Sequence, residues 1–266
     1  MKMPFEKIGT RPWLRLPQGR AVGWAAWRHN GWAGRTLTVM LGIGVVVTSI
    51  SYGQEASEAA ARRHLAATVP ALTAALGDPN SAVRAEAAMA LREMKPQAKA
   101  ALPALAALLA DGDGYVRGTA ARSLERMGAD AAPCIVPLLW NPHAEVRELA
   151  AVTLRALGQD GKAAIPALTE RLRDPCPDVR EAAAKALRRM LPEAKIAIAA
   201  LAELLRDRDG YVRSTAAETL ERMGPEAAPS VAMVLRDPNP QVRDLAAYTL
   251  QQIGAAMWTS GQAVSR

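Results

Sequence analysis

From about residue 66 onward, apolar side chains recur with the spacing of an α-helix. In the stretch VRAEAAMALREM, the apolar residues Val83, Ala87, Leu91 and Met94 stand at i, i+4, i+8 and i+11. Residues at these intervals lie along one side of a helix. The pattern predicts an amphipathic helix whose apolar side faces a core.

This helix recurs six times. Each copy contains a Val-Arg dipeptide, and the successive intervals are 33, 30, 33, 33 and 30 residues. The dipeptides are Val83-Arg84, Val116-Arg117, Val146-Arg147, Val179-Arg180, Val212-Arg213 and Val242-Arg243. Six residues before each arginine stands Asp78, Asp111, Asn141, Asp174, Asp207 or Asp237. Six concordant copies indicate a repeat protein.

Turn-forming residues mark both ends of the recurring helix. Pro177 and Pro240 are placed at its first position, where a missing N–H costs nothing. The expected N-caps are Asn80, Asp113, Asp209 and Asn239. The expected stops are Gly128, Gly158, Gly224 and Gly254.

A second apolar pattern, such as Leu102, Leu105, Leu108 and Leu109, precedes each copy and predicts another helix. Prolines within these preceding helices should kink them. They are Pro70, Pro103, Pro137 and Pro166.

Each repeat is therefore a helix pair of about 33 residues, which cannot bury its apolar side alone. Stacking the pairs would bury a continuous core, so the fold class is all-α, an α-solenoid of six helix pairs over residues 55–256. The sequence DGYVR occurs at 113–117 and again at 209–213, 96 residues later. This indicates the duplication of a triplet of helix pairs. Residues 257–266 are expected to form a flexible tail.

The net charge of +7 is concentrated at the amino terminus. Residues 1–54 hold seven Lys or Arg and one acid, whereas residues 55–266 hold 26 basic and 25 acidic residues. A nearly neutral body argues against nucleic-acid binding, which depends on positive charge facing the phosphates.

The amino-terminal segment predicts membrane targeting. Residues 36–54 carry no charge and, as a helix, would span about 28 Å at ~1.5 Å per residue, so one hydrophobic helix should precede the solenoid. Basic residues precede this run, which favours export of the carboxy-terminal body. We expect an uncleaved anchor; a cleaved signal peptide and a buried core helix are the alternatives. Residues 1–35 are expected to be disordered.

The stretches DPNSAVRAEAAMAL, DPCPDVREAAAKAL and DPNPQVRDLAAYTL resemble the HEAT-repeat family, in its bacterial short form labelled phycobilisome-lyase-like. The resemblance covers about residues 66–255. It implies that the recurring Asp and Arg pair between adjacent repeats as a buried ladder. Its members would be Asp78, Arg84, Asp111, Arg117, Asn141, Arg147, Asp174, Arg180, Asp207, Arg213, Asp237 and Arg243. Asn141 departs from the pattern and should weaken one rung.

Candidate chemistry is sparse. His143 and Cys176 fall in the N-cap slot, where they are interpreted as turn residues, and Cys134 is interpreted as a small core residue. Some enzymes contain such repeats, and deoxyhypusine hydroxylase holds iron with His-Glu dipeptides. This chain has no His-Glu dipeptide, which argues against that activity. A bilin-lyase-type enzyme or accessory protein remains the alternative function.

The preferred interpretation is a membrane-anchored, non-catalytic scaffold that binds a protein or peptide. No cofactor, metal, small-molecule substrate or nucleic acid is expected. The candidate partner-binding residues are Tyr115, Trp140 and Tyr211, which interrupt the run of small side chains. The alternative is that these rings pack over neighbouring turns. The solenoid is expected outside the cytoplasm, either anchored or, after signal cleavage, secreted or periplasmic.

Overall fold

The computed structural model describes residues 68–95 and 97–264, with residues 255–264 described by their backbone alone. The amino-terminal segments 1–35 and 36–54, and residues 55–67 of the expected solenoid, lie outside this part. Among the helices of the described part, none has both the length and the apolar character needed to cross a membrane.

The described residues form six helix pairs and contain no strand. The second helices of the pairs are α3 (Ser81–Glu93), α5 (Gly114–Met127), α7 (Ala144–Leu157), α9 (Pro177–Arg189), α11 (Gly210–Met223) and α13 (Pro240–Val264). The first helix of the first pair covers residues 68–75. The other first helices are α4 (Leu102–Ala107), α6 (Ala132–Ile135), α8 (Ile165–Arg171), α10 (Ile198–Glu203) and α12 (Ala228–Val234).

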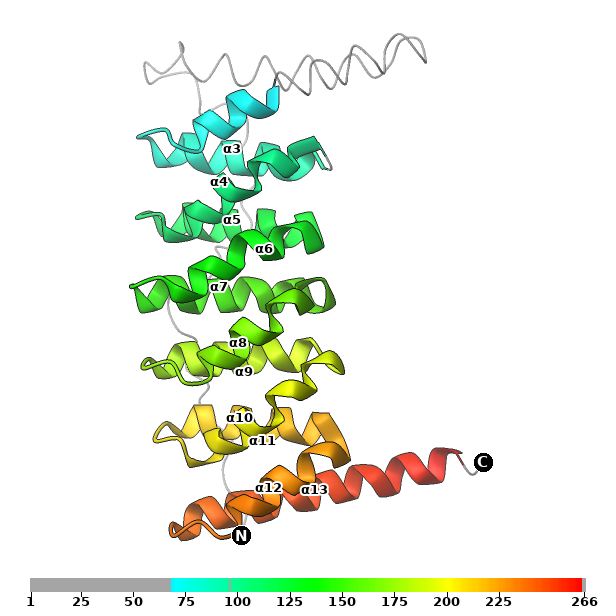
Figure 1. Cartoon of the computed structure of the whole chain (residues 1–266). Coiled ribbons are helices and arrows are strands. Elements are labelled where there is room, and N and C mark those ends of the chain that lie inside the picture. The colour runs from blue at the N-terminus through cyan, green and yellow to red at the C-terminus, as the bar shows by residue number, and fades with distance from the viewer. Residues whose placement is uncertain (1–67, 96, 265–266) are drawn as a thin grey trace, which may run out of the picture. The chain divides into compact units, whose positions relative to one another are not determined.

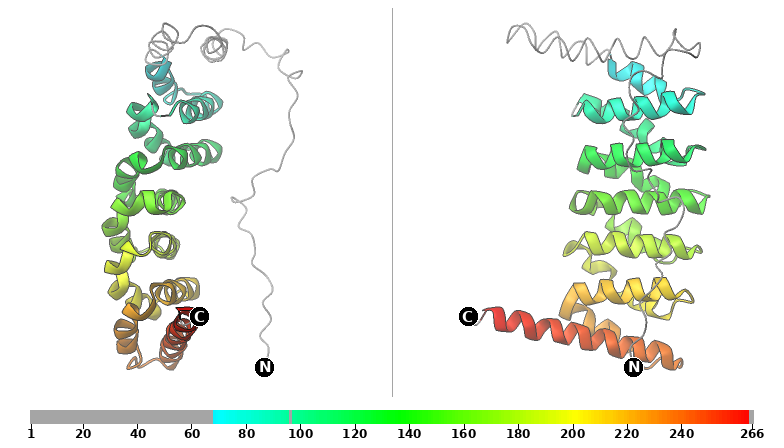
Figure 2. Two further views of the ribbon diagram at one scale, coloured as in Figure 1. Left: turned by 90° about the vertical axis from the view of Figure 1, so that its right-hand side faces the viewer. Right: turned by 180° about the vertical axis from the view of Figure 1, so that it is seen from behind.

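The pairs stack one after another, as the repeats predicted. Each second helix contacts the next, in the order α3, α5, α7, α9, α11 and α13. The first helices form a separate layer along one side of the second helices (Figure 1; Figure 2). The third and fourth pairs, on either side of the duplication, are joined through α7 and α9. The described residues are therefore an α-solenoid.

The core is a column of equivalent residues. The leucine seven positions after the repeat arginine is 0% exposed at Leu91, Leu124, Leu154, Leu187 and Leu220. Full burial of one such side chain contributes roughly 1.5–3 kcal/mol. Because these leucines belong to one core that runs through all the pairs, the stability of each repeat depends on the repeat beside it.

The first helices differ from the expected kinked helices. From the second pair onward, each is divided into 3₁₀ and α segments, for example η4 (Gln97–Ala101), α4 and η5 (Leu108–Ala110). Pro103 and Pro166 lie in the first turn of α4 and α8, where proline needs no hydrogen-bond acceptor. These prolines therefore start a helical segment and do not bend one.

Three of the four expected glycine stops are confirmed. Gly128, Gly158 and Gly224 end their helices with φ of +72°, +56° and +77°, in the left-handed region that favours glycine. Gly254 was predicted wrongly, because α13 continues through it to Val264. The residues after Gly254 include the helix formers Ala255 and Ala256. Residues 257–264, expected as a tail, are thus helical.

Candidate functional site

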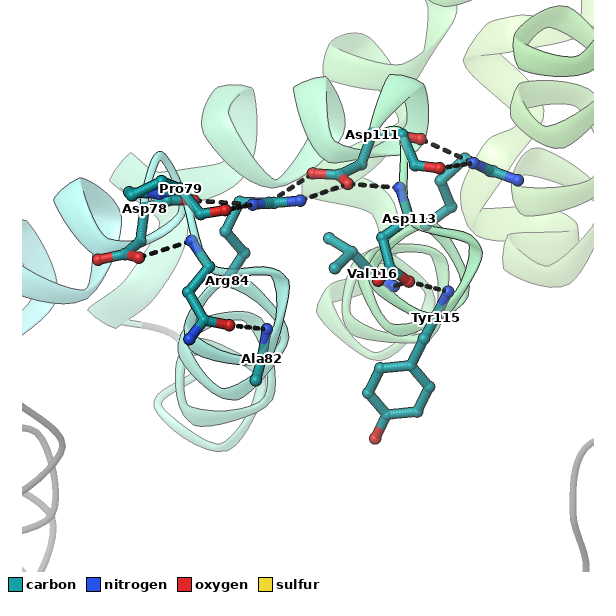
Figure 3. A network of polar contacts seen from close by, with 11 residues as sticks. Asp78, Pro79, Ala82, Arg84, Asp111, Asp113, Tyr115 and Val116 are labelled. Carbon is teal, nitrogen blue, oxygen red and sulfur yellow. Dashed lines mark hydrogen bonds and ion pairs between the residues drawn. The ribbon is translucent and has the colours of Figure 1, made fainter. Parts of the chain in front are cut away.

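Charged side chains connect adjacent repeats at several of the turns between the two helices of a pair. The Arg84 Nε and Nη2 atoms donate to the two carboxylate oxygens of Asp111, both at 2.7 Å (Figure 3). Arg84 Nη1 donates to the backbone carbonyls of Asp78 at 2.8 Å and Pro79 at 3.1 Å. One guanidinium therefore donates hydrogen bonds to the backbone carbonyls in the turn of its own repeat and also binds the carboxylate of the next repeat.

The same geometry recurs in two further rungs. Arg147 binds Asp174 through two hydrogen bonds of 2.8 Å, and Arg180 binds Asp207 at 2.7 and 2.8 Å. In all three rungs, the arginine and the carboxylate are 27 residues apart. The Asp174 side chain is 0% exposed, so its charge relies on these bonds.

The rungs change the titration of their carboxyl groups. The Arg84 hydrogen bonds hold the pKa of Asp111 below its ordinary value, and the Asp113 backbone N–H adds to the effect. Burial alone would raise the pKa of Asp174, but the Arg147 hydrogen bonds and the Cys176 N–H outweigh it and leave that pKa lowered. These aspartates are therefore ionised near neutral pH.

Two expected rungs are not formed. Arg117 Nη1 donates to the carbonyls of Asp111 at 2.7 Å and Gly112 at 3.1 Å, and Arg213 Nη1 donates to those of Asp207 and Arg208 at the same distances. Within the described part of the chain, neither arginine forms an ion pair or a hydrogen bond to a carboxylate. The implied pairs with Asn141 and Asp237 are corrected accordingly.

The absence of a carboxylate at Asn141 does not explain both gaps, because Asp237 has one and Arg213 still does not bind it. The common feature is the 30-residue interval, which separates arginine and acceptor position by 24 residues instead of 27. The deletion lies in the connection to the next first helix. This connection is four residues long in η6 (Gly128–Ala131) and η11 (Gly224–Ala227), but seven in η8 (Gly158–Ala164).

The two ends of the ladder are also incomplete. The Asp78 carboxylate accepts the Asn80 backbone N–H at 2.8 Å, and no arginine of the described residues binds it. Arg243 Nη1 donates to the carbonyls of Asp237 at 2.8 Å and Pro238 at 2.9 Å. The Asp237 carboxylate is bound instead by Arg206 Nε at 2.6 Å.

The residues in the N-cap slot fall into two groups. Side chains of the expected caps accept backbone N–H groups of the first helical turn, as Asp113 does from Tyr115 at 2.8 Å. The others that behave in this way are Asn80, Asp209 and Asn239. His143 and Cys176 occupy the slot without a side-chain capping bond. Cys134 is half-buried in α6, and burial raises the pKa of its thiol.

The aromatic residues differ in their surroundings. Tyr115 and Tyr211 are 60% and 70% exposed at equivalent positions in the first turns of α5 and α11. Figure 3 shows the Tyr115 ring pointing away from the ladder. Trp140 is 48% exposed, and the Arg171 guanidinium lies 5.2 Å from the centre of its ring.

One exposed aromatic residue was missed by the sequence analysis. Tyr248, on α13, is 55% exposed. The equivalent positions, five residues after the repeat arginine, hold Met89, Arg122, Val152, Lys185 and Glu218, so the one aromatic residue among them was the available signal.

The comparisons with known proteins agree with this architecture. The chain matches the family described as HEAT repeats over residues 51–125, 102–188, 132–221 and 197–257. No curated protein matches it in sequence.

Solved structures share the fold at low sequence identity. One is a chain of the computationally designed armadillo repeat proteins for modular peptide recognition. It has 18% identity over 69% of this chain and 99% of that chain, with a TM-score of 0.44. Another is the complex of CpcE and CpcF of phycocyanin lyase from Nostoc sp. PCC7120, with 22% identity over 57% and 98% and a TM-score of 0.43. A chain from work on TOG–tubulin binding specificity has 14% identity over 71% and 85% and a TM-score of 0.50.

Proposed function

This chain belongs to the HEAT-repeat family, and we propose that it is a non-catalytic scaffold that binds a protein or peptide on its helical stack. The observation that carries the proposal is the exposure of Tyr115 and Tyr211 at equivalent positions of the two triplets. Tyrosine combines a large apolar ring with a hydroxyl, and it is enriched among residues that dominate binding energy.

Buried hydroxyl groups link neighbouring second helices, which supports a rigid stack. The Ser123 hydroxyl lies 2.9 Å from the carbonyl oxygens of both Ala88 and Thr119, so its single proton is shared between them. In the other triplet, the Thr219 hydroxyl donates to the carbonyl of Thr215 at 2.7 Å and lies 3.5 Å from that of Ala184. Together with the ladder, these bonds join one second helix to the next, which supports a stack that holds its surface side chains at fixed separations.

The finer part of the proposal is that residues 36–54 anchor this scaffold in a membrane and that the solenoid faces the extracytoplasmic side. The uncharged run and the basic residues before it support this. An anchored scaffold would hold its partner near the membrane surface.

The test is affinity capture with the purified full-length protein and identification of the bound partner by mass spectrometry. We expect the double variant Tyr115→Ala/Tyr211→Ala to lose at least tenfold in partner affinity. The matched control is Met233→Ala, which removes an apolar side chain that is 66% exposed on the other helix layer. Undiminished capture by the tyrosine variant would contradict the proposed surface.

The bilin-lyase alternative is separated by an absorption spectrum of the same preparation. A scaffold shows only the absorption of its tryptophan and tyrosine residues. A bound pigment that absorbs visible light would support the alternative instead.

A further inference from the structure

Arg117 and Arg213 present guanidinium groups whose carboxylate-binding edges are vacant. In the three complete rungs, Nη1 binds turn carbonyls while Nε and Nη2 bind a carboxylate, as at Arg84. Arg117 and Arg213 make the same Nη1 bonds to their turns. Within the described residues, their Nε and Nη2 atoms have no hydrogen-bond partner.

These vacant edges reach solvent. In the described part of the chain, the buried side-chain nitrogen and oxygen atoms without a hydrogen bond are Thr119 Oγ1 and Arg171 Nε. The Nε and Nη2 atoms of Arg117 and Arg213 are not among them, so water or a ligand can contact them. An orphaned arginine inside the core would be a structural defect, whereas these are accessible donors.

The residue three positions before each of the two arginines has no side chain. Gly114 and Gly210 occupy this position, and a Cβ atom there would lie 3.5 and 3.6 Å from the respective Nη2 atom. The other four repeats have Ser81, Ala144, Pro177 and Pro240 at this position. Glycine therefore precedes the vacant edge at both gaps inside the ladder. Arg243, the last arginine of the ladder, also binds only turn carbonyls, but it has Pro240 at this position.

We propose that Arg117 and Arg213 are two receptor sites for carboxylate side chains of an acidic, extended partner segment. The chain itself indicates what the ligand is. At the equivalent position of other repeats, an arginine binds the carboxylate of Asp111, Asp174 or Asp207 at 2.7–2.8 Å. A planar guanidinium binds a carboxylate through two parallel hydrogen bonds. This inference rests on the proposed scaffold function and adds the chemistry of the partner.

The two sites lie in the second and fifth repeats, at the edge of the stack where the ladder turns are found (Figure 1). With about 9 Å between adjacent packed helices, three repeats place them roughly 27 Å apart. An extended peptide advances about 3.4 Å per residue, so carboxylates about eight residues apart would reach both sites. The cap residues Asp113 and Asp209 lie four residues before these arginines in the sequence, and their negative charge should weaken the binding of a single carboxylate.

The probe is a fluorescein-labelled peptide in which two aspartates eight residues apart are set in an uncharged Ser/Gly/Thr sequence. Binding to the full-length protein is measured by anisotropy at low ionic strength. We expect the two-aspartate peptide to bind at least tenfold more tightly than a one-aspartate peptide, because the second contact is intramolecular. The peptide with both aspartates changed to asparagine should show no binding, and this control leaves the protein unaltered.

Protein variants locate the contact. Arg117→Gln and Arg213→Gln should each reduce the affinity of the two-aspartate peptide to that of the one-aspartate peptide. Arg126→Gln and Arg222→Gln remove exposed charges from the last turns of the same helices and should leave it unchanged. Equal binding of the asparagine peptide, or retained affinity in both receptor variants, would overturn the proposal. Tight binding of a phosphoserine peptide without binding of the aspartate peptide would also overturn it.

The two sets of experiments distinguish failure of the carboxylate receptors from failure of the proposed scaffold surface. If the tyrosine variants lose the captured partner while the aspartate peptide does not bind, the scaffold remains and the carboxylate receptors are wrong. If the peptide binds through Arg117 and Arg213 while the tyrosine variants still capture the partner, the tyrosine surface is wrong and the receptors remain.

Discussion

Arg213 and Asp237 hold equivalent ladder positions in adjacent repeats, yet no hydrogen bond or ion pair joins them. Arg206 Nε binds the Asp237 carboxylate at 2.6 Å, while Arg213 binds only the carbonyls of its own turn. The same gap occurs at Arg117, where the residue equivalent to Arg206 is Ala110. Competition from Arg206 therefore cannot be the common cause, and the short interval between the repeats is the feature that both gaps share.

The complete and incomplete rungs provide a matched pair for stability. Arg180→Ala removes two turn-carbonyl bonds and leaves Asp207 buried without its partner, so we expect a loss of about 3 kcal/mol in the free energy of unfolding. Arg117→Ala removes only the equivalent carbonyl bonds and should cost about 1 kcal/mol. Chemical denaturation measures both values. Equal losses would show that the Asp207 pair adds nothing.

Asn141→Asp tests whether side-chain identity or spacing causes the first gap. We expect the free energy of unfolding to change by less than about 0.5 kcal/mol, as for a surface substitution. The reason is that Asp237 already carries the carboxylate at the equivalent position without binding Arg213. A clear gain in stability that disappears in the Asn141→Asp/Arg117→Ala double variant would attribute the gap to the asparagine instead.

The ladder should make stability fall in acid. The pKa values of Asp111, Asp174 and Asp207 are lowered in the folded state, so the unfolded chain takes up protons at a higher pH than the folded chain. Their stabilising contribution is thus present above the unfolded-state pKa of about 3.9 and is lost as pH falls through the lower folded-state values.

Denaturation between pH 7 and pH 3 measures this effect. The free energy of unfolding should be nearly constant from pH 7 to about pH 5 with respect to these groups, and it should decline below about pH 4. In Asp207→Asn the decline should be shallower, because one titrating group is absent. An identical decline in the variant would show that Asp207 does not contribute.

Two glycines should respond oppositely to alanine. At Gly161, a Cβ atom would lie 2.8 Å from Met190 Cε and 3.0 Å from the Leu154 carbonyl oxygen, so Gly161→Ala should destabilise by about 1–3 kcal/mol. At Gly118, inside α5, an added Cβ atom would meet nothing within 4 Å apart from the backbone of its own helix, and Gly118→Ala should stabilise by about 0.5–1 kcal/mol. Thermal unfolding distinguishes the two. A stabilised Gly161→Ala variant would refute the packing argument.

The proposed topology is tested by reporter fusions at the carboxy terminus. A phosphatase that needs disulfides should be active, because such bonds form outside the cytoplasm, and a cytoplasmic reporter should be inactive. Deleting residues 36–54 should reverse both results. Activity of the cytoplasmic reporter alone in the intact chain would exclude export.

The amino-acid sequence by itself determined the helix pairs, their number and their stacking. Periodic apolar positions such as Leu91 and the recurring Val-Arg dipeptides reflect local geometry, and a helix pair with one apolar side has to pack against a neighbour. Caps at Asp113 and stops at Gly128 were predictable for the same reason, since they depend on a few adjacent residues.

Only the tertiary structure decided which rungs form, which aromatic rings stay exposed and where the last helix ends. The Arg213–Asp237 gap and the Arg171 guanidinium over Trp140 each depend on the position of a neighbouring element. The continuation of α13 beyond Gly254 was not visible in the local sequence signal. A change of three residues in a connection is small in sequence. A hydrogen bond, however, is lost when its donor–acceptor distance grows by a few tenths of an ångström. The length of the connection therefore decides whether an arginine binds a carboxylate of the next repeat or remains available to a partner.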